Sequence, residues 1–385
     1  MTKKSSTPAI RFKGFTDTWE QRKLCDVVKE ITRNDPESEA PIMMITANNG
    51  FIEQSERYAF NNAGESLKKY ILLKKGELAY NHGASKLRPY GSCFALTTAE
   101  NARIPFVYHC FSAENQNAEF MSIELNGAEI ENQLRKIVSS GARMDGLLNI
   151  SFDEYTSVSV LLPGIEEQDC IADFFRQLDN LITLHQRKYD KLTNVKKSML
   201  EKMFPKNGSN VPEIRFKGFT EAWEQRKLGE LVDVCSGRDY KHLSEGTIPV
   251  YGTGGYMLSV NEALSYDKDA IGIGRKGTID KPYILKAPFW TVDTLFYAIP
   301  REKVDLNFAF DIFQNIDWKK KDESTGVPSL SKTVINNIYV LAPKFEEQQV
   351  LGRFFSRIDN LITLHQRELE KLKNLKKACL EKMFV

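Results

Sequence analysis

The chain has 385 residues, of which 42% are hydrophobic and 27% are charged. These fractions exclude a disordered or fibrous protein, and a formal net charge of only +2 excludes the strongly basic class of DNA-binding proteins. The sequence has no apolar run of roughly 18 residues, and its first residues lack the apolar core of a signal peptide. We therefore expect a cytoplasmic protein that does not associate with membranes.

An internal duplication organises the chain. The segment IRFKGFT at residues 10–16 recurs at residues 214–220, and WEQRKL at residues 19–24 recurs at residues 223–228. The repeat of about 200 residues is far longer than the repeat of a solenoid or a propeller. The sequence therefore predicts two domain-sized halves that share a framework.

The first variable segment, residues 25–162, is predicted to consist mainly of strands and turns. Short apolar runs alternate with Gly and Asn in residues 69–91, and a strand-like run ends at Leu162. Polar, basic and aromatic side chains gather at a Gly-rich turn, where they could contact DNA phosphates and base edges. A solvated loop without a ligand is the alternative for any one of these residues. The candidates are Asn81, His82, Ser85, Lys86, Arg88 and Tyr90.

One long amphipathic helix is predicted for residues 163–205. Apolar residues step by three and four from Ile171 to Met199, and no Pro or Gly follows Gly164 until Pro205, where the linker PKNGSNVP begins. A helix of about 38 residues extends about 57 Å, which is more than a single globular core covers. We therefore expect this helix to pack against another long element.

The second variable segment, residues 229–342, also has the pattern of strands and turns. Gly272, Gly274 and Gly277 satisfy the G-x-G-x-x-G pattern of dinucleotide-binding loops. That motif needs a helix directly after it, whereas the following stretch has a strand-like pattern and contains Pro282, so we do not favour a nucleotide site. The candidate DNA contacts of this segment are Tyr251, Thr253, Arg275, Lys276, Thr278 and Lys281.

A second copy of the long helix is predicted for residues 343–385. The block that begins at Pro163 recurs from Pro343 with the same spacing of apolar residues. Two copies of one apolar seam predict that the helices pack on each other, with His185 and His365 as paired or register-fixing residues. Ordinary core histidines, and a seam that serves only for dimerisation, are the alternatives.

No catalytic or metal-binding motif is found in the sequence. Phosphate-binding loops, amino-methyltransferase motifs, zinc-protease motifs and serine-hydrolase motifs are all missing. The cysteines are scattered without metal-ligand spacing, so we expect reduced thiols and a non-catalytic protein. The cysteines are Cys25, Cys93, Cys110, Cys170, Cys235 and Cys379.

The chain resembles the specificity subunits of type I restriction-modification enzymes. The resemblance spans essentially the whole chain and rests on the duplicated W-E-Q-R-K-L, the L-P-G-I-E-E-Q before the first long helix and the ending L-E-K-M-F of both helices. Further matching phrases are GELAYN (76–81), GARMDGLLNIS (141–151), IPVYGTGGY (248–256), AIGIGRKGT (270–278), VDTLFY (292–297) and PSLSK (328–332).

The resemblance implies an α+β fold with two tandem target recognition domains, two long antiparallel coiled-coil helices and a pseudo-two-fold internal duplication. The implied domains are a first recognition domain at residues 1–162, a central helix at 163–205, a second recognition domain at 206–342 and a C-terminal helix at 343–385.

The resemblance also implies the function. Each recognition domain would read one half of a bipartite, asymmetric DNA target, while the helices set the gap and dock the modification subunits, which directs both methylation and restriction. The implied partners are double-stranded DNA, two modification subunits and two restriction subunits. No cofactor is expected in this chain: S-adenosylmethionine for adenine N6 methylation would bind the modification subunit, and ATP and Mg²⁺ the restriction subunit. The near-neutral charge is then understandable, because partners would neutralise many of the phosphates.

Roles for individual residues follow from positions that match the family phrases. Arg275, Lys276, Thr278 and Lys332 are the leading contacts of the second half, and Arg143 joins the candidates of the first half. A nucleotide-dependent enzyme and a purely structural coiled-coil scaffold are the two alternatives to DNA recognition. The residues expected to bind the modification subunits are Phe174, Phe175, Leu178, Leu181, Ile182, Phe354, Phe355, Ile358, Leu361 and Ile362.

Overall fold

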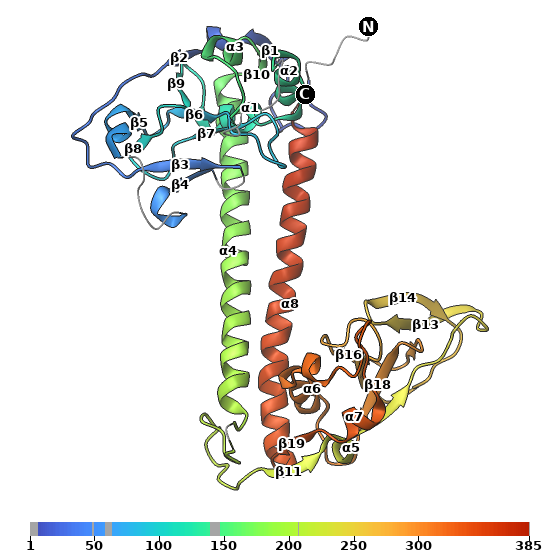
Figure 1. Ribbon diagram of the computed structural model, residues 1–385. Helices are drawn as coiled ribbons and strands as arrows, with labels where there is room; N and C mark the ends of the chain where they lie inside the picture. The colour runs from blue at the N-terminus through green and yellow to red at the C-terminus, as the bar shows by residue number, and fades with distance from the viewer. Residues whose placement is uncertain (1–6, 48–49, 58–63, 139–146, 207, 385) are drawn as a thin grey trace. The chain divides into compact units, whose positions relative to one another are not determined.

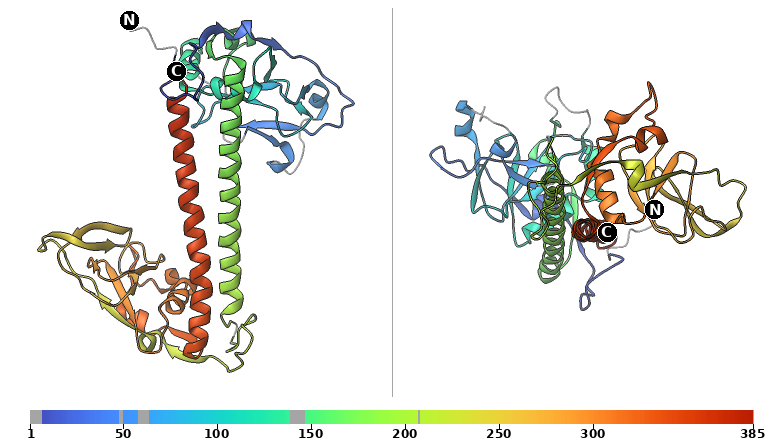
Figure 2. Two further views of the ribbon diagram at one scale, coloured as in Figure 1. Left: turned by 180° about the vertical axis from the view of Figure 1, so that it is seen from behind. Right: turned by 90° about the horizontal axis from the view of Figure 1, so that it is seen from below.

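The computed structural model describes residues 7–47, 50–57, 64–138, 147–206 and 208–384, and Figure 1 shows its helices and strands. Two helices are far longer than the rest: α4 (Ile165–Met203) has 39 residues and α8 (Phe345–Lys382) has 38 (Figures 1 and 2). The predicted mixture of strands, short helices and two long helices is confirmed. In the described part of the chain, no helix combines the length and the apolar character needed to cross a membrane.

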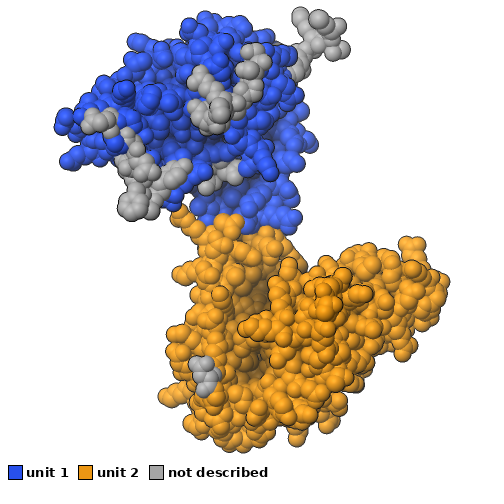
Figure 3. Space-filling model, in the orientation of Figure 1, with its two compact units in different colours: residues 1–184, 369–385 blue, residues 185–368 orange. Residues whose placement is uncertain are grey.

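The chain divides into two compact units (Figure 3). The first unit contains residues 1–184 and 369–385, and the second contains residues 185–368. Each unit therefore includes part of α4 and part of α8. The predicted domain boundaries separate the helices from the recognition domains and do not coincide with this division, so they stay a prediction about function.

In each unit the two long helices pack side by side. In the second unit His185 faces His365, with 3.2 Å between their Nδ1 atoms, and Lys196, further along α4, contacts Asp359, which is earlier on α8. The helices are therefore antiparallel there. The pairing of the two histidines is as the sequence predicts.

The predicted seam needs one correction near the end of each helix. Val195 and Leu375 continue the three- and four-residue spacing of the apolar seam, yet both are exposed. Lys196 lies inward instead, is only 9% exposed and bonds Asp359, while the half-buried Lys376 contacts Asp179. A straight helix drifts by about 20° per heptad from a 3.5-residue seam, so the inward position moves by one residue after several turns.

The first unit is built around a four-stranded antiparallel sheet with the order β2-β9-β6-β7. Two smaller strand pairs, β3 with β4 and β5 with β8, belong to the same unit, and short helices cover the sheet where it meets the long helices. The elements are η1 (Leu24–Asp26), β2 (Val28–Glu30), β3 (Met43–Thr46), β4 (Gly50–Glu53), η2 (Gln54–Glu56), η3 (Gly64–Lys69), β5 (Ile71–Lys74), β6 (Leu78–Asn81), β7 (Ser92–Ala95), β8 (Asn101–Ile104), β9 (His109–Ala113), α1 (Ala118–Leu125), α2 (Ala128–Ile137) and α3 (Phe152–Thr156).

The second unit has a four-stranded sheet with the order β12-β18-β15-β16 and a three-stranded sheet with the order β14-β13-β17. Helix α6 packs between the first of these sheets and the long helices, where its apolar face joins the main core. The elements are α5 (Leu228–Leu231), β12 (Val232–Ser236), β13 (Glu245–Gly252), β14 (Gly255–Val260), β15 (Ala270–Gly274), β16 (Tyr283–Leu285), β17 (Trp290–Thr291), β18 (Leu295–Pro300), α6 (Leu306–Asn315), η4 (Trp318–Lys321) and α7 (Lys332–Asn336).

Both variable segments begin and end at a short antiparallel strand pair. In the first unit β1 (Glu20–Lys23) pairs antiparallel with β10 (Ser159–Leu162), directly before α4. In the second unit β11 (Glu224–Lys227) pairs antiparallel with β19 (Tyr339–Ala342), directly before α8. The repeated EQRK sequence therefore closes each variable segment against the strand that leads into a long helix.

The other repeated residues tie each opening segment to the first turn of a long helix. Arg11 donates two hydrogen bonds of 2.6 Å to Glu167, and Arg215 donates two of 2.7 Å to Glu347. Both carboxylates are almost fully buried. A bidentate guanidinium–carboxylate contact fixes orientation as well as distance, which explains why these residues belong to the repeated framework.

The glutamine after each buried glutamate of the repeated framework positions the short helix that covers the core of its unit. The Gln168 side-chain oxygen accepts from the backbone N–H of Asn117, the N-cap of α1. In the second unit Gln348 accepts from the N–H of Asp305, the N-cap of α6. Helices α1 and α6 are therefore equivalent elements of the two units, although their sequences differ.

In each unit the opening repeated segment is also hydrogen-bonded to the end of a long helix. The backbone N–H of Ile10 donates to Lys382 at the end of α8, and the N–H of Ile214 donates to Lys202 at the end of α4, both at 2.9 Å. The tryptophan of each repeated segment lies after this contact in the sequence and is buried in the core. Trp19 packs edge-on against Phe120 and Phe384, and Trp223 against Phe308 and Phe204.

Candidate nucleic-acid interface

The glycine-rich motif of the second unit forms a tight turn at the end of β15. A Cβ atom on Gly274 would lie 1.9 Å from the carbonyl oxygen of Thr278, and Gly277 has φ +92°. The turn itself therefore requires both glycines. The chain then enters β16 rather than a helix, so the motif lacks the helix N-terminus that would bind a pyrophosphate.

Two predicted segments of the second unit meet at this turn. The N–H of Leu330 donates to the carbonyl of Arg275 at 2.9 Å, and the N–H of Gly277 donates to Pro328 at 2.8 Å. The phrase PSLSK is thereby bonded to the phrase GIGRKGT, although about 50 residues separate them in the sequence. Lys332 follows at the start of α7, behind its cap Ser331.

The side chains of this turn present positive charge to solvent. Arg275, Lys276 and Lys281 are exposed, while Thr278 and Lys332 are half-buried. The Arg275 guanidinium lies 5.8 Å from the ring centroid of Phe296, which limits its freedom without neutralising it. An exposed, oriented guanidinium can reach a phosphate or a guanine edge.

Sequence reasoning missed three lysines beside this turn. Lys319, Lys320 and Lys321 lie on η4, next to the buried Trp318. Lys319 Nζ is 2.9 Å from an oxygen of Asp280, and this hydrogen-bonded contact raises the pKa of Lys319 and lowers the pKa of Asp280. The run of three lysines was visible in the sequence, but its position beside residues 275–281 depends on the fold.

The remaining predicted DNA contacts of the second unit, Tyr251 and Thr253, lie in the hairpin formed by β13 and β14. Thr253 is half-buried in its turn, and Tyr251 packs against the rings of Tyr256 and Tyr283. The Tyr283 hydroxyl donates to the carbonyl of Gly252 at 2.7 Å and so ties the hairpin to β16. Tyr256, which the prediction did not include, is 63% exposed and is the aromatic ring of this hairpin that a ligand can reach.

The predicted residues of the first unit gather at the loop after β6, but several serve the loop itself. The Asn81 side chain donates to the carbonyl of Ile45 and accepts from the N–H of Gly83. The Ser85 hydroxyl accepts from the N–H of Arg88. Both side chains therefore have partners within the protein, which sequence alone could not indicate.

Arg88 and Tyr90 are held against α1 and α2. Arg88 donates to the carbonyl of Asn126 at 2.7 Å, and its burial lowers its pKa, an effect that the charge of Glu131 opposes. The Tyr90 ring lies 5.8 Å from the Arg135 guanidinium.

Lys86 is exposed at the tip of the loop, beside Leu87, which is 65% exposed. His82 is buried, with both ring nitrogens against backbone carbonyls. Arg143 lies outside the described residues.

The residues expected to bind the modification subunits differ in their exposure to solvent. The equivalent residues Leu184 and Leu364, which the prediction did not include, are 46% and 51% exposed. They belong to the sequence DNLITLHQR, which is identical in both helices. Among the predicted residues, Phe175, Leu178, Phe355 and Ile358 are buried in the cores, Phe174, Ile182, Phe354 and Ile362 are half-buried, and Leu181 and Leu361 are exposed.

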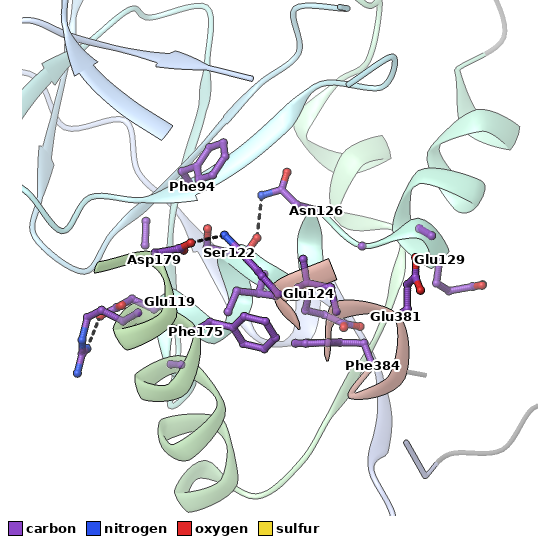
Figure 4. A pocket seen from close by; sticks show the side chains of 18 of the residues that line it. Phe94, Glu119, Ser122, Glu124, Asn126, Glu129, Phe175, Asp179, Glu381 and Phe384 are labelled. Atoms are coloured by element: carbon purple, nitrogen blue, oxygen red, sulfur yellow. Dashed lines mark hydrogen bonds and ion pairs between the residues drawn. The ribbon is translucent and has the colours of Figure 1, made fainter. Parts of the chain in front are cut away.

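A cavity of about 830 Å³ opens in the first unit between α1, α2 and the two long helices (Figure 4). Phe175 and Phe384 line it, and Ser122 of α1 borders it. At the position equivalent to Ser122, α6 of the second unit carries Phe310, whose ring centroid lies 5.8 Å from Lys196 Nζ. Because α1 has the small Ser122 where α6 has the ring of Phe310, Ser122 contributes to the cavity of the first unit.

Comparisons with known proteins agree with this architecture. Residues 220–374 match the family model described as the type I restriction modification DNA specificity domain. The type I restriction enzyme MjaVIII specificity subunit of Methanocaldococcus jannaschii is 26% identical over 280 residues, which cover 62% of this chain and 64% of that protein. The putative MjaX specificity subunit of the same organism is 26% identical over 254 residues, which cover 60% of this chain and 59% of that protein.

The matched segments thus span less than two thirds of either relative's length. The fold is similar to the crystal structure of a type I restriction-modification S subunit from M. genitalium, with a TM-score of 0.69, 16% identity, and coverage of 98% of this chain and 99% of that one. The family model over residues 220–374 and the two relatives thus show that the chain is similar to the specificity subunits of type I restriction-modification enzymes, and the solved structure has a similar fold.

Proposed function

We propose that this chain reads a bipartite, asymmetric DNA target, one half with each variable segment, as a non-catalytic cytoplasmic subunit. The observation that carries the proposal is the exposed basic turn of the second unit, which carries Arg275 and Lys276 and leads to Asp280, the partner of Lys319 on η4. Arginine and lysine supply most phosphate contacts, and arginine also reads guanine. Because the two variable segments differ while their frame is duplicated, the two half-sites should differ in sequence.

The long helices would set the gap between the half-sites. Half-sites read from one face of a duplex are about 34 to 36 Å apart, or a multiple of that distance. Helices of 39 and 38 residues, each about 57 Å long at 1.5 Å per residue, are long enough to span such a distance.

Two modification subunits would dock on the repeated helix surfaces. Leu181 and Leu184 on α4, and Leu361 and Leu364 on α8, are exposed leucines at equivalent positions. Two equivalent apolar surfaces suit two copies of one partner. Methylation of adenine with S-adenosylmethionine would then belong to the modification subunits, and ATP- and Mg²⁺-dependent restriction to two further subunits.

Co-expression with the modification subunit of the same host, followed by long-read mapping of N6-methyladenine, tests the proposal. We expect a split motif that is methylated on one strand in each half. A well-formed complex that methylates no motif would refute DNA recognition and favour the scaffold alternative. The binding of NAD or ATP by the isolated chain would instead favour the nucleotide-dependent alternative.

A further inference from the structure

His82 has an unusual environment at the end of β6. Its side chain is buried, with 8% exposure, and lies between two backbone carbonyl groups. Nδ1 is 2.8 Å from the oxygen of Leu148, and Nε2 is 2.7 Å from the oxygen of Val107. Both ring nitrogens therefore face hydrogen-bond acceptors.

The two contacts place a chemical requirement on the imidazole. A neutral imidazole carries one N–H and one lone pair, so it can donate to only one of the carbonyl groups. The other nitrogen then directs its lone pair at a carbonyl oxygen. The protonated ring has two N–H groups and can donate to both oxygens at once.

These contacts join three separate parts of the first unit. The residues after His82 form the loop that carries Lys86, while Val107 lies in the turn before β9 and Leu148 lies just before α3. The backbone repeats the connection, because Leu148 donates its N–H to the carbonyl of His82 at 2.9 Å and Gly83 forms a bridge with Leu147.

Two titratable rings, His109 and Tyr80, pack against His82. The His109 ring stacks on it with 5.3 Å between centroids, and its Nε2 is 3.0 Å from the oxygen of Ile150, in the same segment as Leu148. Burial lowers the pKa of His109, the hydrogen bond to Ile150 opposes this, and the charge of His82 adds to the lowering. Tyr80 contacts the ring from β6, with 6.4 Å between centroids. The Leu148 and Val107 contacts are made through backbone carbonyl groups.

We propose that His82 is a positioning residue for the first half-site, which holds the loop of residues 83–91 in its reading position by bonding it to residues 147–150 and to the turn before β9. His82 therefore acts through the loop and does not touch DNA. The inference rests on the proposed DNA recognition.

The test uses the full chain in complex with its modification subunit. Binding to the mapped target is compared with binding to DNAs that carry single-base changes in either half-site. His82→Gln should lower the discrimination in the first half-site by about five- to tenfold, because the fixed loop would be lost. The second half-site should be unaffected.

A control variant separates the clamp from other histidines. His242→Gln, at an exposed histidine of the second unit, should change neither half-site. The inference is overturned if His82→Gln keeps the discrimination of the wild type, or if it weakens both halves equally. In the wild type the Leu148 amide should exchange slowly, so rapid exchange there would overturn the clamp even if His82→Gln does not fold.

Hydrogen exchange distinguishes failure of the inference from failure of the proposed function. Loss of the clamp should speed exchange of the Leu148 amide in His82→Gln without any DNA present. Faster exchange in a complex that reads no target would refute the role in recognition while keeping the clamp. Unchanged exchange together with a normal split target would refute the clamp alone.

Discussion

Replacing Arg215 with Met tests the buried ion pair that joins the second repeated segment to α8. The guanidinium donates to both oxygens of Glu347 at 2.7 Å, and the side chains of Arg215 and Glu347 are 12% and 3% exposed. Removal of the guanidinium leaves a buried carboxylate without its charged partner. Such a loss typically costs about 3 to 5 kcal/mol, so we expect a decrease of this size in the stability of the second unit.

Urea unfolding of the full chain, combined with hydrogen exchange of peptides from the starts of α4 and α8, measures this effect in each unit. Lys344→Met is the matched control. Lys344 Nζ lies 2.6 Å from Glu221, but the two side chains are 70% and 64% exposed, and exposed ion pairs contribute little. The double change Arg215→Met with Glu347→Leu should recover much of the loss, because no buried charge is left.

The reasoning is refuted if Arg215→Met lowers the unfolding midpoint no more than Lys344→Met does. The first unit provides an independent repeat of the experiment. Arg11 and Glu167 make the same bidentate contact at 2.6 Å, with 12% and 2% exposure, so Arg11→Met should destabilise the first unit by a similar amount.

Three further predictions concern the second unit. Arg275→Ala should cost about 1 to 3 kcal/mol of DNA binding and relax one base of the second half-site, as measured on DNAs with single-base changes; equal weakening on all DNA would indicate a phosphate contact instead. Gly352→Ala should destabilise the unit by about 1 to 3 kcal/mol in urea unfolding, because the new Cβ would lie 2.3 Å from Oδ1 of the cap residue Asp305. Ala172→Gly, at the equivalent site of the first unit, should not disturb α1, and an undisturbed α6 in Gly352→Ala would contradict the argument. Burial raises the pKa of Asp311, so the wild type loses stability as the pH rises from about 4 through that raised pKa. Asp311→Asn should therefore become increasingly stabilising with pH, and a pH-independent difference would show that the carboxyl group is not buried in this way.

Much of the fold could be predicted because the duplication and the helical periodicity are local features of the sequence. The burial of a lysine at position 196 could not be predicted in this way. Asp359 and Gln314 accept hydrogen bonds from the ammonium group of Lys196, and those partners come from distant parts of the chain. A periodic pattern assigns a lysine to the surface, since it contains no information about such partners.

The candidate site could be predicted less well than the fold. Residue type indicated a polar loop at Asn81 and His82, but it did not reveal that both side chains bond within the protein. The position of Lys319 beside Asp280 depends on the packing of η4, which no spacing in the sequence reveals. Loop composition therefore indicated where a site lies better than which side chains face outward.

The backbone contacts of Ile10 and Ile214 with the ends of the long helices affect the order in which the segments can follow one another along the chain. Residues 204–214 lead directly from α4 to the contact made by Ile214, whereas in the first unit the same contact joins Ile10 to α8 across the two ends of the sequence. The two opening segments thus occupy equivalent places, each against the end of a long helix. A circularly permuted gene that starts at residue 213 and links the end of α8 to residue 10 should encode a protein with the same contacts, in which the second variable segment precedes the first.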